Sequence, residues 1–131
     1  MQTDRAEDVA LTEAAFRIAN ERTSRWEERH RDRAEELYLC ECAARPCRER
    51  IALTREQYEA VRSDVRRFFV VPGHVVPDLE TVVESFTTYQ VVEKPNALMD
   101  LLRQTDPRGH GAGEAADAAH TIADEIDPAG A

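Results

Sequence analysis

The sequence predicts an α+β fold, in which a long N-terminal helix precedes a small antiparallel sheet of hairpins packed with one central helix. Two observations support this class. The first 36 residues contain no Gly or Pro and are rich in Ala, Glu and Arg, which favour helices. Residues 37–95 instead alternate between short strand-favouring runs and turn residues, with one stretch of helical period among them. Helices and strands grouped in this way are typical of α+β folds.

Residues 5–36 are expected to form the N-terminal helix. Its apolar residues are few, and the stripe that they form at three- and four-residue spacing includes several polar positions. Such a stripe is too weak for a coiled coil. We therefore expect a short hydrophobic patch, with Phe16 and Trp26 as its anchors, to contact either a partner protein or the chain's own domain. The helix also offers a surface for a homodimer.

The region 37–95 is expected to form the small α+β domain. Its first part, 37–54, predicts a hairpin because two strand-favouring runs flank the turn sequence AARP. A helix follows, with Thr54 as N-cap and Gln57 completing a capping box. The run FFVVPGHVVP predicts a buried strand that ends in a Pro-Gly turn, and LETVVESFTTYQVVEK predicts a second hairpin that turns at 85–88.

Residues 96–131 are expected to add a short helix and then a disordered acidic tail. The sequence NALMDLLRQ fits one or two helical turns after Pro95. The remainder is rich in Gly, Ala and Asp, with almost no large apolar residue, so it should not bury enough surface to offset its chain entropy. The predicted organisation is therefore an N-terminal helix at 1–36, the domain at 37–95 and the tail region at 96–131.

The charge pattern argues against nucleic-acid and membrane partners. The net charge is −9, and acidic and basic residues are interleaved, so no segment has the basic excess of a general nucleic-acid binder. No apolar run approaches the ~20 residues that span a bilayer. The acidic N-terminus does not resemble a secretory signal. We therefore expect a cytoplasmic protein whose thiols stay reduced.

All three cysteines lie within eight positions, in the sequence CECAARPC. Because side chains alternate along a strand, Cys40 and Cys42 should point to one side and Glu41 to the other. A turn through Pro46 would then return Cys47 to the pair. Three thiolates at one point repel one another unless a cation lies among them or they stay protonated. The pattern predicts a metal site, with ordinary buried cysteines and a thiol redox centre as alternatives.

A tetrahedral zinc or an iron–sulfur cluster needs a fourth ligand. His74 is the candidate, because it follows a predicted strand on a Pro-Gly turn that exposes its ring. Glu41 or Glu49 could serve instead, although carboxylates are less usual in structural zinc sites. We expect zinc, with a [2Fe–2S] cluster as the alternative. The predicted ligands have the spacing C-x-C-x₄-C-x₂₆-H and are Cys40, Cys42, Cys47 and His74.

The motifs FRIANER, CEC…C, IALTREQYEAVR, RFFVVPGH and YQVVEK follow one another between residues 16 and 94. This order resembles a family of small uncharacterised bacterial proteins with the pattern FRxxNER, CECxxxxC, an aliphatic-x-Leu-Thr stretch with EYExVR, VxPGH and VVEK. The resemblance implies that the three cysteines and His74 belong to one module. Residues 1–15 and the tail lie outside it.

The stretch CEC…RPC is also similar to the CDGSH-type iron–sulfur motif, in which CxC, a proline-preceded cysteine and a histidine hold a [2Fe–2S] cluster. Here the third cysteine comes earlier than in that motif. The sequence CRER stands where Asp-Gly-x-His would follow. This departure favours zinc over the cluster.

The function predicted from these features is that of a small non-enzymatic zinc-binding protein, a regulatory protein–protein interaction module that contacts its partner through the N-terminal helix. Four protein ligands would fill a zinc site and leave no position for water. No P-loop, GxGxxG or HExxH motif occurs.

Two other functions stay open. A redox or metal sensor could use the same Cys₃His site with zinc or a [2Fe–2S] cluster, with Arg45 and Arg48 lowering the thiol pKa values. A hydrolase or transferase could use Cys47 and His74 as a nucleophile pair.

Overall fold

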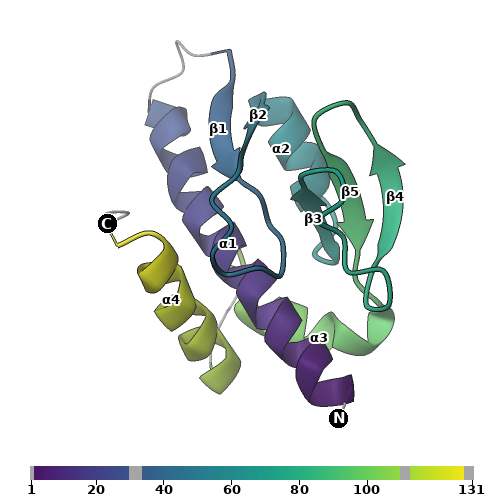
Figure 1. The fold of residues 1–131 in the computed structure, drawn as a ribbon. Coiled ribbons are helices and arrows are strands. Elements are labelled where there is room, and N and C mark those ends of the chain that lie inside the picture. The colour runs from purple at the N-terminus through teal and green to yellow at the C-terminus, as the bar shows by residue number, and fades with distance from the viewer. Residues whose placement is uncertain (1, 30–33, 110–112, 129–131) are drawn as a thin grey trace.

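The computed structural model describes residues 2–29, 34–109 and 113–128. It confirms the α+β class: helix α1 (Gln2–Arg29) is followed by two small antiparallel sheets and by further helices (Figure 1). The part of the expected N-terminal helix at 30–33 lies outside the described residues. The expectation was wrong for 34–36, because residues 34 and 35 are not helical and Glu36 begins a strand. No helix among the described residues is long and apolar enough to cross a bilayer.

The first sheet is the predicted hairpin. Strands β1 (Glu36–Leu39) and β2 (Arg50–Leu53) pair antiparallel, with Tyr38 opposite Ile51. A long loop joins them and carries all three cysteines.

Helix α2 (Arg55–Arg62) begins with the predicted capping box. The N–H of Gln57 donates to Thr54 Oγ1 at 3.1 Å, and the N–H of Thr54 donates to Gln57 Oε1 at 2.8 Å. Two otherwise unpaired N–H groups at the start of the helix are thereby satisfied.

The second sheet has the strand order β3-β5-β4 and is antiparallel throughout. Its strands are β3 (Arg67–Val70), β4 (Thr81–Ser85) and β5 (Gln90–Glu93), which confirms the predicted strand and second hairpin. Strand β4 lies at the edge, is largely exposed, and contains an irregularity in its pairing between Val82 and Glu84.

An aromatic cluster holds the two sheets and α2 together. The rings of Tyr38 on β1 and Tyr58 on α2 stack with centroids 4.4 Å apart, and Phe69 on β3 meets Tyr38 edge-on at 6.2 Å. All three side chains are fully buried. Offset stacking and edge-on contact are the arrangements that aromatic quadrupoles favour.

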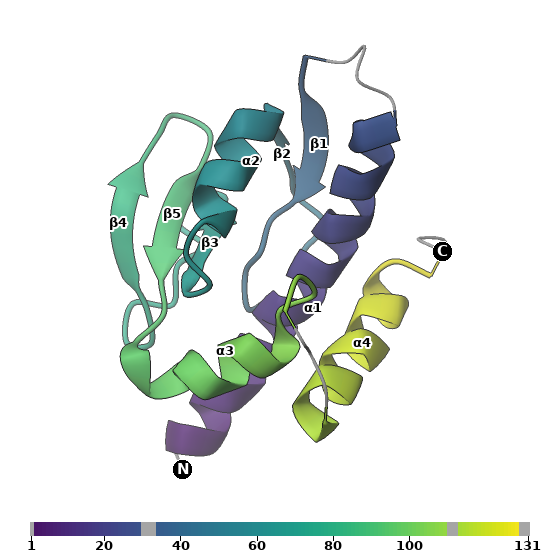
Figure 2. The same ribbon diagram turned by 180° about the vertical axis from the view of Figure 1, so that it is seen from behind.

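Helix α1 lies between α4 (Glu114–Ile126) and the sheets in both ribbon views (Figures 1 and 2). Every residue from 12 to 21 is buried, so the helix buries more of its surface than the short hydrophobic patch that the sequence predicted. One side of the helix packs its apolar residues on α4. The other side carries charged residues that reach into the domain.

The expectation of a disordered tail was wrong for 114–126. After the short helices η1 (Asn96–Leu98) and α3 (Met99–Thr105), which match the predicted helical turns, the chain forms α4. Alanines carry little side-chain entropy, so they can pack closely on α1 at low cost. The tail residues 110–112 and 129–131 lie outside the described residues. The buried residues of α4 recur at three- and four-residue spacing and are Ala116, Ala119, Ile122, Ala123 and Ile126.

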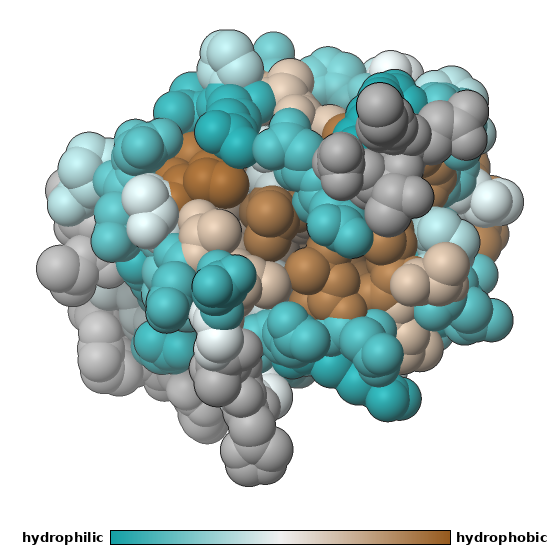
Figure 3. All heavy atoms as spheres, turned by 90° about the horizontal axis from the view of Figure 1, so that it is seen from below, coloured by the Kyte–Doolittle hydropathy of each residue, from teal (hydrophilic) through white to brown (hydrophobic). Residues whose placement is uncertain are grey.

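The contact with α4 also corrects the prediction for Phe16. Its side chain is 0% exposed and belongs to the cluster that α1 and α4 form, so it packs inside its own chain instead of facing a partner. Trp26 is partly buried, and its role as a partner contact stays a prediction. On the face where α1 begins, hydrophobic residues lie in separate patches bordered by hydrophilic ones (Figure 3).

Candidate metal centre

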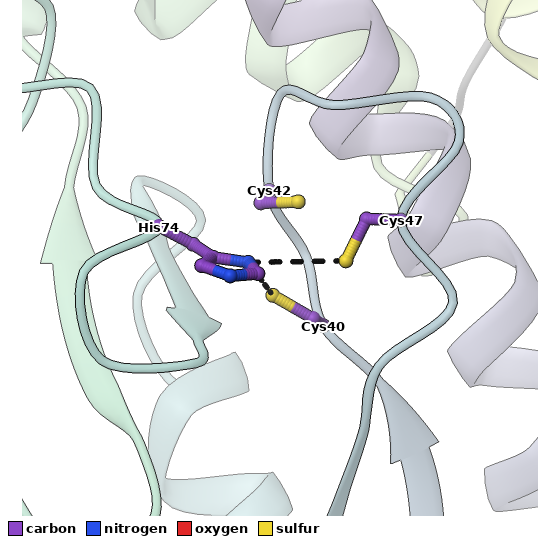
Figure 4. Close-up of side chains that lie close together, drawn as sticks. All are labelled: Cys40, Cys42, Cys47 and His74. Carbon is purple, nitrogen blue, oxygen red and sulfur yellow. Dashed lines mark hydrogen bonds between the residues drawn. The ribbon is translucent and has the colours of Figure 1, made fainter.

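Three cysteines from the β1–β2 loop and one histidine from the β3–β4 loop come together at one point. Their sulfurs and the imidazole ring face one another (Figure 4). One potential ligand atom from each of the four side chains lies within 4.8 Å of all the others. Among the described residues, no other group of three or more His, Cys, Asp or Glu side chains meets in this way. The structure thus brings together the whole predicted set, Cys40, Cys42, Cys47 and His74.

The two cysteines of CEC share a side although β1 ends before them, at Leu39. Beyond β1 the backbone of this segment stays hydrogen-bonded to other parts of the chain. The N–H of Cys40 donates to Glu49 O and the N–H of Glu41 donates to Phe69 O, both at 2.9 Å. Extended backbone keeps the alternation of a strand. The sulfurs of Cys40 and Cys42 therefore face the cluster, while the carboxylate of Glu41 points into the core.

The turn through Pro46 returns the third cysteine, as expected. The N–H of Cys47 donates to Ala44 O at 2.9 Å and closes the turn. The pairing of Cys40 with Glu49 then leads the chain into β2.

His74 reaches the cluster through the Pro72–Gly73 turn. Gly73 has a φ of 93°, which a residue with a Cβ adopts only under strain. The N–H of His74 donates to Val71 O at 2.9 Å. The ring Nδ1 then lies 3.6 Å from the sulfur of Cys40 and 3.8 Å from that of Cys47 (Figure 4). The arrangement is compatible with metal binding.

The thiols are electrostatically coupled. A hydrogen bond between Cys40 and Cys42 raises the pKa of Cys40 and lowers the pKa of Cys42 to about 5. Burial is the main cause that raises the pKa of Cys47. Cys42 is therefore the first of the three thiols to ionise, because the pKa values of the other two are raised.

Backbone hydrogen bonds favour the ionised sulfurs. The N–H of Val71 donates to the sulfur of Cys40 at 3.2 Å, and backbone hydrogen bonds of Ala44 and Glu49 lower the pKa values of Cys42 and Cys47. Such contacts orient ligands and stabilise thiolate charge around a metal.

The two alternative ligands, Glu41 and Glu49, do not belong to the cluster. The Glu41 carboxylate is fully buried and is bound by Arg17 on the far side from the cluster, while Glu49 is exposed and lies outside the four-residue group. Arg45, which the sensor hypothesis placed near the thiols, instead bonds to Asp8 and Thr12 on α1.

Sequence reasoning missed the residues of α1 that hold the CEC segment. Asn20 donates to Leu39 O at 2.8 Å and accepts from the N–H of Leu39 at 2.7 Å. Arg17 Nη2 donates to Glu41 Oε1 at 2.8 Å. Both residues belong to the motif FRIANER. The sequence signal that could have identified them is that polar residues lie next to the apolar Phe16 in this motif.

A second buried charge group anchors the loop of His74. Lys94 Nζ lies 2.8 Å from Glu13 Oε1 on α1 and donates to Glu80 Oε2 at 3.2 Å, and all three side chains are fully buried. Glu80 Oε1 accepts the N–H of Val76 at 2.8 Å, close to His74 in the chain. Desolvation raises the pKa of Glu13 well above its usual range. The Lys94 cation is therefore accompanied more readily by one ionised and one protonated carboxyl group than by two ionised ones.

Comparison with models of protein families, with curated proteins and with solved structures finds no match. The resemblance to a bacterial family stays a prediction.

Zinc binding should release about two protons per ion near pH 8, because the thiols of Cys40 and Cys47 are protonated and that of Cys42 is not. Affinity should therefore fall as the pH falls, since protons compete for these two sulfurs. Calorimetric titration in buffers of different ionisation enthalpy measures the number of protons released. The pH is chosen so that a free imidazole is neutral and contributes no proton. Release of three protons, or of none, would contradict the coupling.

Proposed function

We propose that this chain is a small non-enzymatic zinc-binding protein that acts in the cytoplasm as a regulatory protein–protein interaction module. The observation that supports this proposal most is the convergence of four protein ligands on one point. Structural zinc sites have four protein ligands, whereas catalytic sites keep a position for water. With His74 bound, the site has no position for a substrate.

Zinc is the proposed metal because the dimensions suit a single ion. Zn–S bonds of about 2.3 Å and Zn–N bonds of about 2.0–2.1 Å set tetrahedral sulfur and nitrogen ligands roughly 3.6 Å apart. The two sulfur-to-Nδ1 separations are 3.6 and 3.8 Å. A [2Fe–2S] cluster divides its ligands between two irons. Four ligand atoms within 4.8 Å of one another fit one ion better than such a divided set.

A redox or metal sensor is the second candidate, favoured by the exposure of part of the site. Cys47 and His74 are only partly buried, whereas Cys40 and Cys42 are buried. An oxidant could therefore reach Cys47 first and release the metal.

Replacing His74 with alanine should markedly weaken zinc retention, because it removes one ligand. Metal analysis and absorption spectra of anaerobically purified protein measure the effect. His120→Ala is the matched control, since this exposed histidine lies on α4, and it should keep about one zinc per chain. Full zinc content in His74→Ala would remove His74 from the ligands. Visible bands with iron in the wild type would contradict zinc and favour the sensor.

The partner surface that we propose is a groove between α2 and the β4–β5 hairpin, two elements that lie beside each other in Figure 2. The groove has a volume of about 250 Å³ and includes Val61, Tyr89 and Val91 in its lining. Phe86 stands at its border, 46% exposed, with its ring stacked on Tyr89 at a centroid distance of 4.6 Å. A large exposed aromatic beside an apolar groove is typical of an interaction site.

The charges at the groove select the partner's chemistry. Glu56 and Glu84 line it, and neither forms an ion pair among the described residues. The cation in the lining, Arg67, is already paired with Glu93 at 3.2 Å. Charge complementarity therefore favours a protein segment that carries an apolar side chain next to Lys or Arg.

A short peptide of alternating Lys and Leu should shift the amide NMR signals of the groove residues, whereas a Glu/Leu peptide should not. Phe86→Ser should abolish the shifts. Leu37→Ser, which changes another exposed hydrophobic residue on β1, should leave them unchanged. Equal binding of both peptides, or shifts elsewhere, would contradict this surface. Self-association that Phe86→Ser removes would assign the groove to a second copy instead.

A further inference from the structure

Helix α1 carries a row of ionisable residues that are buried, although burying an unpaired charge is costly. Glu13, Arg17 and Glu21 are spaced four residues apart, so they lie on one side of the helix. Their exposed fractions are 0%, 2% and 5%. Burying a charge is costly unless it is paired and hydrogen-bonded, so each must be held by a specific partner.

Two members of the row reach the two segments that supply the cluster. Arg17 binds the carboxylate of Glu41, which lies between Cys40 and Cys42 in the chain. Glu13 meets Lys94 and, through it, Glu80 at the end of the His74 loop.

The Glu41 carboxylate is bonded on every side. Its Oε1 accepts from Arg17 Nη2 at 2.8 Å and from the N–H of Phe69 at 3.3 Å. Its Oε2 accepts from Asn20 Nδ2 at 3.1 Å and from Arg17 Nε at 3.3 Å. The Arg17 guanidinium also lies 4.0 Å from the centre of the Phe68 ring. Because these bonds fix the Glu41 side chain, the backbone of the CEC segment is restricted to one position.

We propose that two buried side chains of α1, Arg17 and Asn20, position the CEC segment through Glu41 and Leu39 and so assemble the four-ligand site before any metal binds. Arg17, Asn20 and Glu41 are the positioning residues. The inference rests on the proposed zinc function. Asn20 fixes the backbone of Leu39 on both its N–H and its C=O, one residue before Cys40. Arg17 fixes the residue after Cys40. The placement of the first two sulfurs is thus set by the core and not by the ion.

A preassembled site changes what metal binding does. In zinc fingers the apo chain is unfolded, and metal binding is folding. Here two buried hydrophobic clusters exist beside the metal centre, one around Tyr38, Tyr58 and Phe69 and one around Phe16. The metal-free protein should therefore keep its fold, and zinc can enter and leave without unfolding it. Such exchange suits a regulatory protein whose state follows metal supply.

The same helix supplies a matched control. Glu21 is buried like Glu41 and is paired with Arg62 at 3.4 Å and with Arg108 at 2.6 Å, but neither partner belongs to a ligand-bearing loop. Tyr58 also donates to its carboxylate. Loss of this carboxylate should destabilise the protein without moving a ligand.

The test compares wild type, Glu41→Gln and Glu21→Gln in zinc competition with a chromophoric chelator. Glu41→Gln should weaken zinc affinity about 10- to 100-fold, the usual cost of losing a group that orients metal ligands. It should also alter the absorption bands of the cobalt-substituted protein, which report ligand geometry. Both variants should lower the melting temperature by a comparable amount. Glu21→Gln should nevertheless change neither the zinc affinity nor the cobalt spectrum. Equal loss of zinc affinity in both variants would show that lower stability alone weakens zinc binding, and would overturn the proposal.

Two further measurements keep the test decisive. If Glu41→Gln does not fold, Asn20→Ser removes the bonds to Leu39 and the bond to Glu41 Oε2 but keeps the ion pair of Arg17 and Glu41, so neither charge loses its partner. This variant should show the same weaker affinity and altered cobalt spectrum. Amide NMR of the metal-free wild type should show dispersed, folded signals, and an unfolded apo protein would overturn preassembly. If the wild type binds no zinc at all, the proposed function fails instead.

Discussion

The pairing of Arg17 with Glu41 is the interaction on which the rest of the structure depends. The two side chains are 3% and 0% exposed, and removing either partner of such a pair leaves a buried charge, at a cost of about 3–5 kcal/mol. The pair joins the central helix to the segment that supplies two of the four cluster residues. It also bonds to β3 through the backbone N–H of Phe69, so the helix, the cysteine loop and the second sheet meet at one carboxylate.

This constraint explains why the candidate metal centre lies between elements that are distant in the chain. Neither loop is held in place by its own strands alone, because β1 ends before Cys40 and β3 ends before His74. Helix α1 binds the cysteine loop through Arg17 and is linked to the His74 loop through Glu13 and Lys94, and α4 packs on its opposite side. We propose that this α+β core places the four side chains before a metal binds, and a bound metal would then tie the two loops directly to each other.

Local patterns in the sequence predicted the parts of the fold that local physics decides. The capping box of Thr54 and Gln57, the alternation of Cys40 and Cys42, and the Pro-Gly turn before His74 each depend on a few neighbouring residues. The sequence left open whether Phe16 contacts a partner or its own chain, and it did not predict the helix at 114–126. The two are connected, because Phe16 and the buried residues of that helix belong to one hydrophobic cluster. Nor does a sequence show which charged residues are buried, because the partners that accompany Arg17 and Glu13 in the core are distant in the chain.

The most direct test of the central claim, one ion bound by three sulfurs and one nitrogen, is X-ray absorption spectroscopy of the purified, metal-loaded protein. We expect three sulfur scatterers at about 2.3 Å and one nitrogen at about 2.0–2.1 Å around zinc. A shell of light atoms alone, fewer than three sulfurs, or a metal–metal distance of an iron–sulfur cluster would contradict the account.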